Sequence, residues 1–139
     1  MYSIGIDIGG TKIAGALVND LGEIISQTQV PSPAQSAQAM EDAIVGLIQE
    51  LSAGNPVRAA GVAAAGFIDA AQSTVYYAPN IAWRNEPLKD KLEARIDLPI
   101  VIENDANAAG WAEYRFGAGK SFTHMTMLTI GTGVGGAII

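Results

Sequence analysis

The sequence predicts an α/β fold with the element order β-β-β-α-β-α-β-α, followed by the first hairpin of a second, similar domain. Three observations support this prediction. Hydrophobic residues make up 49% of the 139 residues and charged residues only 16%, as in a globular chain with a real core. Short β-branched runs alternate with stretches of helical period. Many of the 16 glycines lie between the predicted strands, where turns are needed.

Three strands with short connections open the chain and predict an antiparallel meander. Residues 2–8 are apolar and β-branched, residues 13–18 resume after a glycine pair, and residues 23–30 follow a turn-forming stretch at residues 19–22. A helix is predicted over residues 34–53, because its apolar side chains recur with a period of about 3.6.

The rest of the chain alternates strands and helices. Residues 57–65 are apolar or small, as in a strand covered on both faces, and residues 67–84 form an irregular excursion. Trp111 and Phe116 share a helix face with small residues and are expected in the core. The remaining elements are a helix at 86–95, a strand at 99–102, a helix at 104–116, a strand at 125–130, a glycine-rich turn at 131–136 and a strand at 137–139.

A domain boundary is expected near residue 118. Residues 1–118 form one domain, and residues 119–139 form a hinge and the start of a second domain. Residues 6–11 and 130–133 both have the order strand and glycine turn, which suggests two related halves. Because Ile139 falls inside an apolar strand, we expect the chain to be the N-terminal portion of a longer protein.

Composition and charge exclude several classes of protein. The net charge of −6 argues against a nucleic-acid partner, which needs a basic surface. The absence of cysteine excludes disulfides and a thiolate zinc site in this span. Asp7 interrupts the first apolar stretch before it could serve as a signal peptide, and no run reaches the roughly 20 apolar residues of a membrane span. We therefore expect a cytoplasmic protein that binds neither nucleic acid nor membrane.

The first candidate motif is residues 7–12, Asp-Ile-Gly-Gly-Thr-Lys. Glycines in a tight turn let backbone N–H groups approach phosphate oxygens, and Asp7 at the strand end can hold Mg²⁺ through water. The spacing differs from that of a Walker A loop and from Gly-x-Gly-x-x-Gly. A plain hairpin turn is the alternative reading. The candidate phosphate ligands are Gly9, Gly10, Thr11 and Lys12.

The second candidate motif is Glu-Asn-Asp at residues 103–105, where a predicted strand passes into a helix. Ligands of α/β proteins commonly bind at such junctions. Asp105 could accept a proton from a substrate hydroxyl, and Asn104 could hydrogen-bond a neighbouring hydroxyl. Alternatively, Asn104 caps the helix and Asp105 complements its dipole. Both interpretations can hold together.

Two further segments are candidates for substrate binding. Gly66 closes the strand at 57–65 and could let a substrate approach the backbone, although strand-end packing explains a glycine there equally well. Asn80 precedes Trp83 in a turn-rich segment. Asn80 could bond a hydroxyl and Trp83 could wall a pocket, or they are a turn residue and a core residue.

These motifs resemble those of a known family. Residues 7–12 resemble the first phosphate motif of the actin-like ATPase superfamily, in the form typical of the ROK sugar kinases (repressor, open reading frame, kinase). Residues 131–136 resemble the second phosphate motif, and residues 103–105 match the family's Glu-Asn-Asp motif. The resemblance covers essentially the whole chain, although Ala65 stands where the family often has proline.

The resemblance implies an actin-like ATPase (ribonuclease H-like) fold with ATP held between two similar domains. It implies that Asp105 is the catalytic base, that Asn104, Gly66 and Asn80 lie at the sugar, and that Mg²⁺ accompanies ATP near Asp7. It places the family's zinc-binding cysteines beyond Ile139 and suggests a homodimer for the full-length protein. The implied ligands on the second phosphate motif are Gly131, Thr132, Gly133 and Gly135.

The implied activity is ATP-dependent phosphorylation of glucose to glucose 6-phosphate, with this portion inactive by itself because half of the cleft is absent. Three alternatives stay open. The acceptor could be fructose, allose, N-acetylmannosamine or N-acetylglucosamine. The donor could be polyphosphate. The protein could instead be a non-catalytic, sugar-responsive regulator, although a strand that starts at Tyr2 leaves no room for the DNA-binding helices of such regulators.

Overall fold

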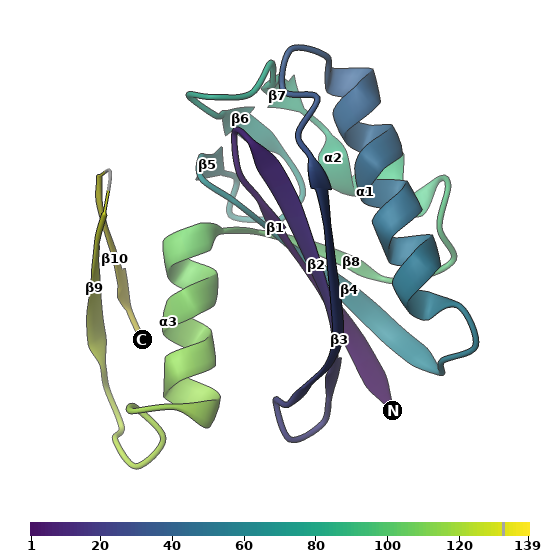
Figure 1. The fold of residues 1–139 in the computed structure, drawn as a ribbon. Helices are drawn as coiled ribbons and strands as arrows, with labels where there is room; N and C mark the ends of the chain where they lie inside the picture. Colours follow the sequence, from purple (N-terminus) through teal and green to yellow (C-terminus); the bar gives the residue numbers. More distant parts are fainter. Residues whose placement is uncertain (132) are drawn as a thin grey trace.

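The computed structural model describes residues 1–131 and 133–139, and it shows a five-stranded mixed sheet with helices on both faces (Figure 1). The predicted element order is confirmed as far as α3, and the excursion contributes three short strands of its own. The elements are β1 (Tyr2–Ile8), β2 (Lys12–Asn19), β3 (Ile24–Pro31), α1 (Ala37–Ser52), β4 (Val57–Ala64), β5 (Phe67–Ile68), β6 (Val75–Tyr77), β7 (Arg84–Glu86), α2 (Leu88–Glu93), β8 (Ile100–Asn104), α3 (Asp105–Phe116), β9 (Thr126–Ile130) and β10 (Val134–Ile138).

The main sheet has the strand order β3-β2-β1-β4-β8. The predicted antiparallel meander is confirmed, since β1 pairs with β2 and β2 with β3 in antiparallel fashion. β4 and β8 extend the sheet on the other side of β1, and both run parallel to it. The carboxyl ends of β1, β4 and β8 therefore lie at one edge of the sheet, which is where α/β folds usually bind ligands.

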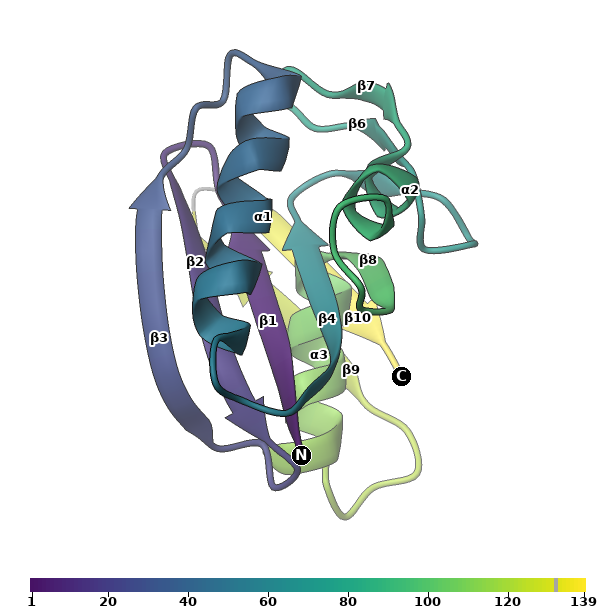
Figure 2. The same cartoon turned by 90° about the vertical axis from the view of Figure 1, so that its right-hand side faces the viewer.

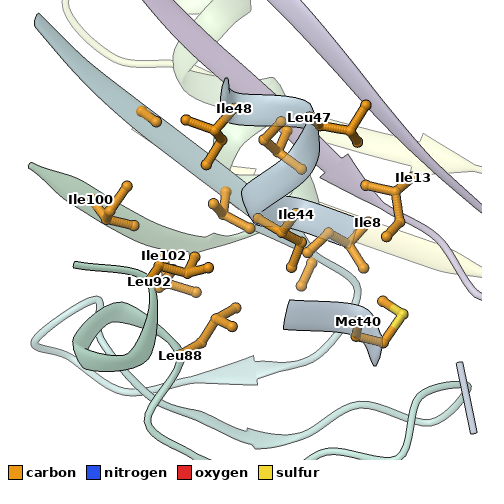
Figure 3. Close-up of a cluster of buried hydrophobic side chains, with 14 of the residues drawn as sticks. Ile8, Ile13, Met40, Ile44, Leu47, Ile48, Leu88, Leu92, Ile100 and Ile102 are labelled. Atoms are coloured by element: carbon orange, nitrogen blue, oxygen red, sulfur yellow. The ribbon is translucent and has the colours of Figure 1, made fainter. Parts of the chain in front are cut away.

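The hydrophobic core lies between this sheet and the pair α1 and α2 (Figures 2 and 3). Strand alternation supplies one side of it: Ile4, Ile6 and Ile8 are buried towards α1. The helical period supplies the other side, with Met40 and Ile44 among the fully buried side chains of α1. No helix in the described part of the chain is long and apolar enough to span a bilayer.

The opposite face of the sheet is lined by small residues, and α3 stands over it (Figure 1). Gly5, Ala14, Gly61 and Ala63 border an open hollow of about 390 Å³ between the sheet and α3. Because side chains alternate along a strand, Asp7 projects to this face, in the same row as Ala63.

The excursion between β4 and β8 folds into a small three-stranded sheet of β5, β6 and β7. It stays attached to the core through Trp83, whose side chain is fully buried. Of the two interpretations of Trp83, core residue or pocket wall, the core residue is therefore confirmed.

The hairpin of β9 and β10 lies on the side of α3 that faces away from the sheet (Figure 1). Small residues allow a close approach. A Cβ built at Gly110 of α3 would lie 2.5 Å from the Cβ of Ala137, and one built at Gly135 would lie 3.2 Å from the Cβ of Ala106. The glycine-rich segment is thus partly strand, since β10 begins at Val134, and the prediction of a turn through residue 136 was wrong.

Two further predictions were wrong in detail. Trp111 and Phe116 are not core residues: they are 50% and 53% exposed, because α3 turns its glycine and alanine side towards the hairpin. The helix predicted over residues 86–95 is shorter, since α2 spans only Leu88–Glu93. Pro87 stands at its N-cap, and the residues before it pair as β7 with β6.

Candidate active site

The candidate residues meet where β1, β4 and β8 end. Across the sheet, Asp7 pairs with Ala63, and Ala63 with Glu103. The next row brings Ile8, Ala64 and Asn104 into line. The β1–β2 turn, the start of the excursion and the start of α3 therefore emerge side by side, although they are far apart in the sequence.

The β1–β2 turn at residues 9–11 is closed by one hydrogen bond, from Gly9 N–H to the carbonyl of Lys12 at 2.9 Å. Ser32 holds it from outside: its Oγ donates to the Gly9 carbonyl at 2.6 Å, and its N–H donates to the Thr11 carbonyl at 2.9 Å. The N–H groups of Gly10 and Thr11 have no hydrogen-bond partner among the described residues. Two backbone donors at a rigid glycine turn suit a phosphate oxygen.

Asp7 carries the clearest electrostatic feature of the site. Partial burial raises the pKa of its carboxyl above the ordinary value, the nearby Asp105 carboxylate raises that pKa further, and Lys12 lowers it. Two carboxylates therefore repel each other here, with one lysine opposing them. This excess of negative charge favours a bound cation.

Such a cation could be Mg²⁺, which proteins commonly hold through one or two carboxylates together with phosphate oxygens and water. Asp7, next to Asp105 and behind the phosphate-type turn, fits this pattern. Among residues 1–131 and 133–139, no group of three or more His, Cys, Asp or Glu side chains is arranged to hold a metal ion.

Asn104 is the N-cap of α3, as one of its two predicted roles requires. Its Oδ1 accepts hydrogen bonds from the N–H groups of Ala106 at 3.0 Å and Asn107 at 3.2 Å, and its Nδ2 donates to the Gly66 carbonyl at 3.1 Å. Because both lone pairs of Oδ1 are engaged, Asn104 can still donate one hydrogen bond to a ligand but has no free acceptor.

Asp105 is the first residue of α3 and is partly exposed. Its Oδ1 accepts a hydrogen bond from the N–H of Ala106 at 2.9 Å. Its Oδ2 has no hydrogen-bond partner in the described part of the chain, so one carboxylate oxygen is available to a substrate hydroxyl. The second motif thus combines helix capping with a free acceptor, and both interpretations of it hold together.

An open cleft of about 720 Å³ brings the acceptor-side candidates together. Gly66 and Asn80 come from the excursion, and Asn104 and Asp105 come from the β8–α3 junction. The far wall is the β9–β10 hairpin, with Gly133, Val134 and Gly135. Phe67 also lines the cleft and is 68% exposed, although the sequence analysis did not single it out.

Gly66 is explained by packing, because a Cβ there would lie 2.6 Å from the carbonyl oxygen of Tyr77. Gly66 also borders the cleft, so both of its interpretations hold. Asn80 borders this cleft and a second, polar hollow that reaches Gly10 and Thr11. Pro79 and Asn80 therefore both adjoin the glycine turn and the acceptor cleft, and Asn80 is the polar one of the two.

Not every candidate enters these hollows. Gly9, Lys12 and Gly131 border neither of them among the lining residues described. The N–H of Gly131 closes its own turn by donating to the Gly133 carbonyl at 2.9 Å. Thr132, the remaining candidate of the second phosphate motif, lies outside the described residues.

Two residues that organise the site were missed. Neither Ser32 nor Gln72 was among the candidate residues predicted from the sequence. Each acts on a partner 23 or 31 positions away in the sequence, Ser32 on Gly9 and Gln72 on Glu103. No local pattern in the sequence indicates such a pairing.

The order of strands and helices up to α3, followed by a facing hairpin, agrees with the actin-like ATPase fold expected from the sequence, and a solved glucokinase of the ROK family shares this architecture. The family model of the ROK family matches residues 3–139, so the chain belongs to the ROK family. The predicted family and fold class are confirmed.

Several relatives carry specific names. The chain is 51% identical over 137 residues to a glucokinase of Streptomyces coelicolor, covering 99% of this chain and 43% of the relative. It is 36% identical to an N-acetylmannosamine kinase of Escherichia fergusonii, covering 47% of that relative. The crystal structure of a ROK family glucokinase from Streptomyces griseus, in complex with glucose and AMPPNP, superposes with a TM-score of 0.92 at 51% identity, covering 100% of this chain and 44% of that one. The chain thus spans less than half the length of these relatives.

Proposed function

We propose that the whole protein transfers the γ-phosphoryl group of ATP to a hydroxyl of glucose, giving glucose 6-phosphate. The observation that carries this proposal is the free Oδ2 of Asp105 in a cleft bordered by Asn104 and by the glycine hairpin of β9 and β10. The similarity to glucokinases at 51% identity supports glucose as the acceptor, and the AMPPNP in the complex of one of them supports ATP as the donor.

On the donor side, the free N–H groups of Gly10 and Thr11 bind phosphate oxygens, assisted by the hydroxyl of Thr11. Gly9 and Lys12 belong to the same phosphate-binding turn. Gly131, Gly133 and Gly135, with Thr132 between them in the sequence, bind phosphate from the facing hairpin. Asp7 holds Mg²⁺ through water, and the ion offsets the charge of the phosphates and of the Asp7–Asp105 pair.

On the acceptor side, Asn104 and Asn80 donate hydrogen bonds to sugar hydroxyls, and Gly66 lets the ring lie close to the backbone. Asp105 Oδ2 accepts a hydrogen bond from the reacting hydroxyl. That hydroxyl oxygen forms a bond to the γ-phosphorus while the bond to the β–γ bridging oxygen breaks, which releases ADP. Since the transition state of phosphoryl transfer is loose, the proton passes to Asp105 late in the step.

The proposal also includes the domain arrangement, the cellular location and the oligomeric state of the whole protein. Residues 1–118 form the acceptor-binding domain, and residues 119–139 form a hinge and the start of the facing domain, so that closure about residues 117–121 excludes water from the cleft. The protein works in the cytoplasm as a homodimer without nucleic acid. Sedimentation of the complete gene product with and without glucose tests the homodimer.

The experiment follows ADP release from Mg-ATP by the complete gene product over a panel of hexoses, with Asp105→Asn beside the wild type. Glucose-dependent ADP release that falls about 10²–10⁴-fold in the Asn variant is expected, since that is the usual contribution of a general base. Asparagine keeps the size of the side chain and can still accept from Ala106 N–H, so the fold is retained.

Other outcomes redirect the proposal. Turnover on N-acetylmannosamine alone would correct the acceptor, in line with the relative at 36% identity. Turnover only with polyphosphate would correct the donor. A folded protein that binds glucose and releases no ADP with either donor would contradict the catalytic role and favour a sugar-responsive regulator.

A further inference from the structure

We propose that Gln72 and Glu103 form a positioning pair, which locks the acceptor-side excursion to the β8–α3 junction and so fixes Asn104 and Asp105 for transfer. This inference rests on the proposed kinase function. It assigns a role to two residues that touch neither donor nor acceptor in that proposal.

The pair is defined by two hydrogen bonds from one residue. The Nε2 of Gln72 donates to Glu103 Oε2 at 2.7 Å, and the carbonyl of Gln72 accepts from the N–H of Ile102 at 2.9 Å. Side chain and backbone of the same residue therefore hold consecutive residues of β8. Two bonds from one residue fix an orientation that a single bond would leave free.

The turn that carries Gln72 is itself rigid. Asp69 Oδ1 accepts from the N–H groups of Ser73 at 2.7 Å and Thr74 at 2.9 Å, and Asp69 Oδ2 accepts from Ser73 Oγ at 2.8 Å. These bonds hold the pKa of Asp69 below its ordinary value, so its charge persists over the whole physiological range. Gln72 is thus presented to β8 by a preformed loop.

The second oxygen of Glu103 reaches the residues at the start of α3. Glu103 Oε1 accepts from the N–H of Asn104 at 2.7 Å and from Asn107 Nδ2 at 3.2 Å. Both carboxylate oxygens are therefore occupied, one by the excursion and one by the junction. Moving Gln72 would move Glu103, and with it the backbone that leads into Asp105.

A third hydrogen bond joins the two segments. Asn104 Nδ2 donates to the Gly66 carbonyl at 3.1 Å, and Gly66 begins the same excursion. The cleft is bordered by both segments, so their relative position sets the distance from a bound hydroxyl to Asp105. Rates of transfer are sensitive to such distances, and a shift of about 1 Å can cost about 10²-fold.

The backbone of Gln72 supports a specific role. Its φ is +56°, in the left-handed region that glutamine rarely adopts. Residues in sparsely populated conformations persist where the surroundings over-determine them, and they concentrate at functional sites. A glycine would fit this backbone better, so the backbone conformation does not account for glutamine here, whereas the side-chain bond to Glu103 does.

The structure offers a matched control in Asn85. Its φ is +49°, it is also exposed, and no hydrogen bond of its side chain is present among the described residues. Asn85→Gly therefore places a glycine at a position of positive φ, as Gln72→Gly does, without removing a link to the site.

The experiment measures kcat and KM of the complete gene product for the variants Gln72→Gly, Glu103→Gln, Asn85→Gly, the double variant Gln72→Gly with Glu103→Gln, and the exchange Gln72→Glu with Glu103→Gln. In the exchange variant the amide at 103 donates to the carboxylate at 72, and its oxygen still accepts from Asn104 and Asn107. All three side-chain bonds can form again, with donor and acceptor reversed.

We expect Gln72→Gly to lower kcat on the order of tenfold, with KM for ATP unchanged, since misplacement acts on the transfer step. Glu103→Gln should stay within about twofold of the wild type, because the amide of Gln72 can turn over and accept a hydrogen bond from the amide at residue 103. The double variant should lose no more than Gln72→Gly, because that substitution alone removes the link. The exchange variant and Asn85→Gly should stay within about twofold of the wild type. An unchanged kcat in Gln72→Gly, or an exchange variant whose kcat stays as low as that of Gln72→Gly, would overturn the proposed positioning role of Gln72 and Glu103.

Amide hydrogen exchange separates this inference from the proposed function. Gln72→Gly should speed exchange at the Asn104 N–H, and the exchange variant should restore its protection, whether or not the protein turns over. Absence of sugar-dependent ADP release in the wild type would remove the proposed function, and the pair would then be judged on exchange alone. Unaltered exchange at Asn104 in Gln72→Gly would overturn it on that criterion.

Discussion

Gly10 and Asn80 are in direct contact across the site: a Cβ built at Gly10 would lie 2.9 Å from the Cβ of Asn80. Gly10 belongs to the proposed phosphate turn, and Asn80 to the excursion that borders the acceptor cleft. The two substrate sides therefore adjoin through a contact that only glycine permits. Any side chain at residue 10 must displace Asn80, because the obstacle is a Cβ and not the flexible end of a side chain.

Gly10→Ala should therefore impair both substrates at once. We expect kcat/KM for ATP and for the sugar to fall about tenfold or more, since small misplacements in a reacting pair are costly. Overpacking should also lower the free energy of unfolding by about 1–3 kcal/mol. Steady-state kinetics and urea unfolding measure the two effects.

Gly5→Ala is the matched control for that variant. A Cβ at Gly5 meets nothing within 4 Å, and alanine is favoured over glycine inside a strand by about 0.5–1 kcal/mol. Unaltered kcat/KM for the sugar in Gly10→Ala would show that Asn80 can move aside without effect. The contact between Gly10 and Asn80 would then not link the phosphate turn to the acceptor cleft.

Asp7→Asn should change stability in a pH-dependent way. The pKa of Asp7 in the folded chain is raised above its ordinary value of 3.8, by burial first and by Asp105 second. The folded state therefore favours the protonated form, and that stabilisation is present below pH 3.8 and is lost as the pH rises through the raised value. At pH 7 the ionised carboxylate destabilises the fold.

The Asn variant should accordingly be more stable than the wild type at pH 7, by about 1 kcal/mol or less because solvent screens a partly exposed group. The difference should vanish in acid. Turnover with Mg-ATP should be lost in the same variant. Asp7 would then be a residue that lowers the stability of the fold but is needed for activity. Thermal unfolding from pH 3 to 8 is the measurement, and a variant less stable than the wild type at pH 7 would contradict it.

Asn104→Ala should separate the structural role of Asn104 from its binding role. Loss of the α3 cap should cost about 1 kcal/mol, and loss of the Nδ2 donor should raise KM for the sugar about tenfold. Ser36→Ala is the control, because Ser36 Oγ caps α1 by accepting from Ala39 N–H at 3.1 Å. Asn104→Ala should lose more stability than Ser36→Ala in urea unfolding, because it also removes the hydrogen bond to the Gly66 carbonyl, and only Asn104→Ala should alter the KM for the sugar. Equal KM values for the sugar in the two variants would show that Asn104 caps α3 but does not bind the sugar.

Much of the fold follows from periodicity in the sequence. β1 was predicted to the residue because residues 2–8 are apolar and β-branched, and α1 was predicted because its apolar residues repeat with a helical period. The glycine turn and the β8–α3 junction were recognised because their residue types suit their chemistry and lie next to each other in sequence.

The rest depends on partners that are distant in sequence. β5, β6 and β7 have two or three residues each, too few to show a period, and the bond from Gln72 to Glu103 joins residues 31 positions apart. Trp111 and Phe116 were assigned to the core because they share a helix face with small residues, but the hairpin packs on α3 around Gly110 and Ala106. Which face of a helix is covered depends on the shape of its neighbour.

Replacement by phenylalanine should destabilise the protein far more at Trp83 than at Trp111. Trp83 is fully buried and its Nε1 has no hydrogen-bond partner among the described residues, so Trp83→Phe loses packing volume and no hydrogen bond. A cost of about 1–3 kcal/mol is expected, below the 3–5 kcal/mol of a change to alanine, with KM for the sugar unchanged. Trp111→Phe, at a half-exposed position, should cost about 0.5 kcal/mol or less. A raised sugar KM in Trp83→Phe would restore Trp83 as a pocket wall.

Gly110→Ala tests whether the β9–β10 hairpin must dock closely on α3. Alanine is favoured over glycine inside a helix by about 1 kcal/mol, and Gly46→Ala in α1, where a Cβ meets nothing within 4 Å, should show that gain. At Gly110 the added Cβ would lie 2.5 Å from the Cβ of Ala137, so the hairpin must shift away from α3.

The same substitution should thus have opposite effects in the two helices. Gly110→Ala should destabilise the protein by about 1–3 kcal/mol despite the better helix propensity. Because Gly133 and Gly135 border the cleft that holds Asp105, the shift should also lower kcat more than it raises KM for the sugar. Urea unfolding and initial rates of both variants measure this, and stabilisation of Gly110→Ala to the level of Gly46→Ala would show that the hairpin and α3 do not need to meet at this point.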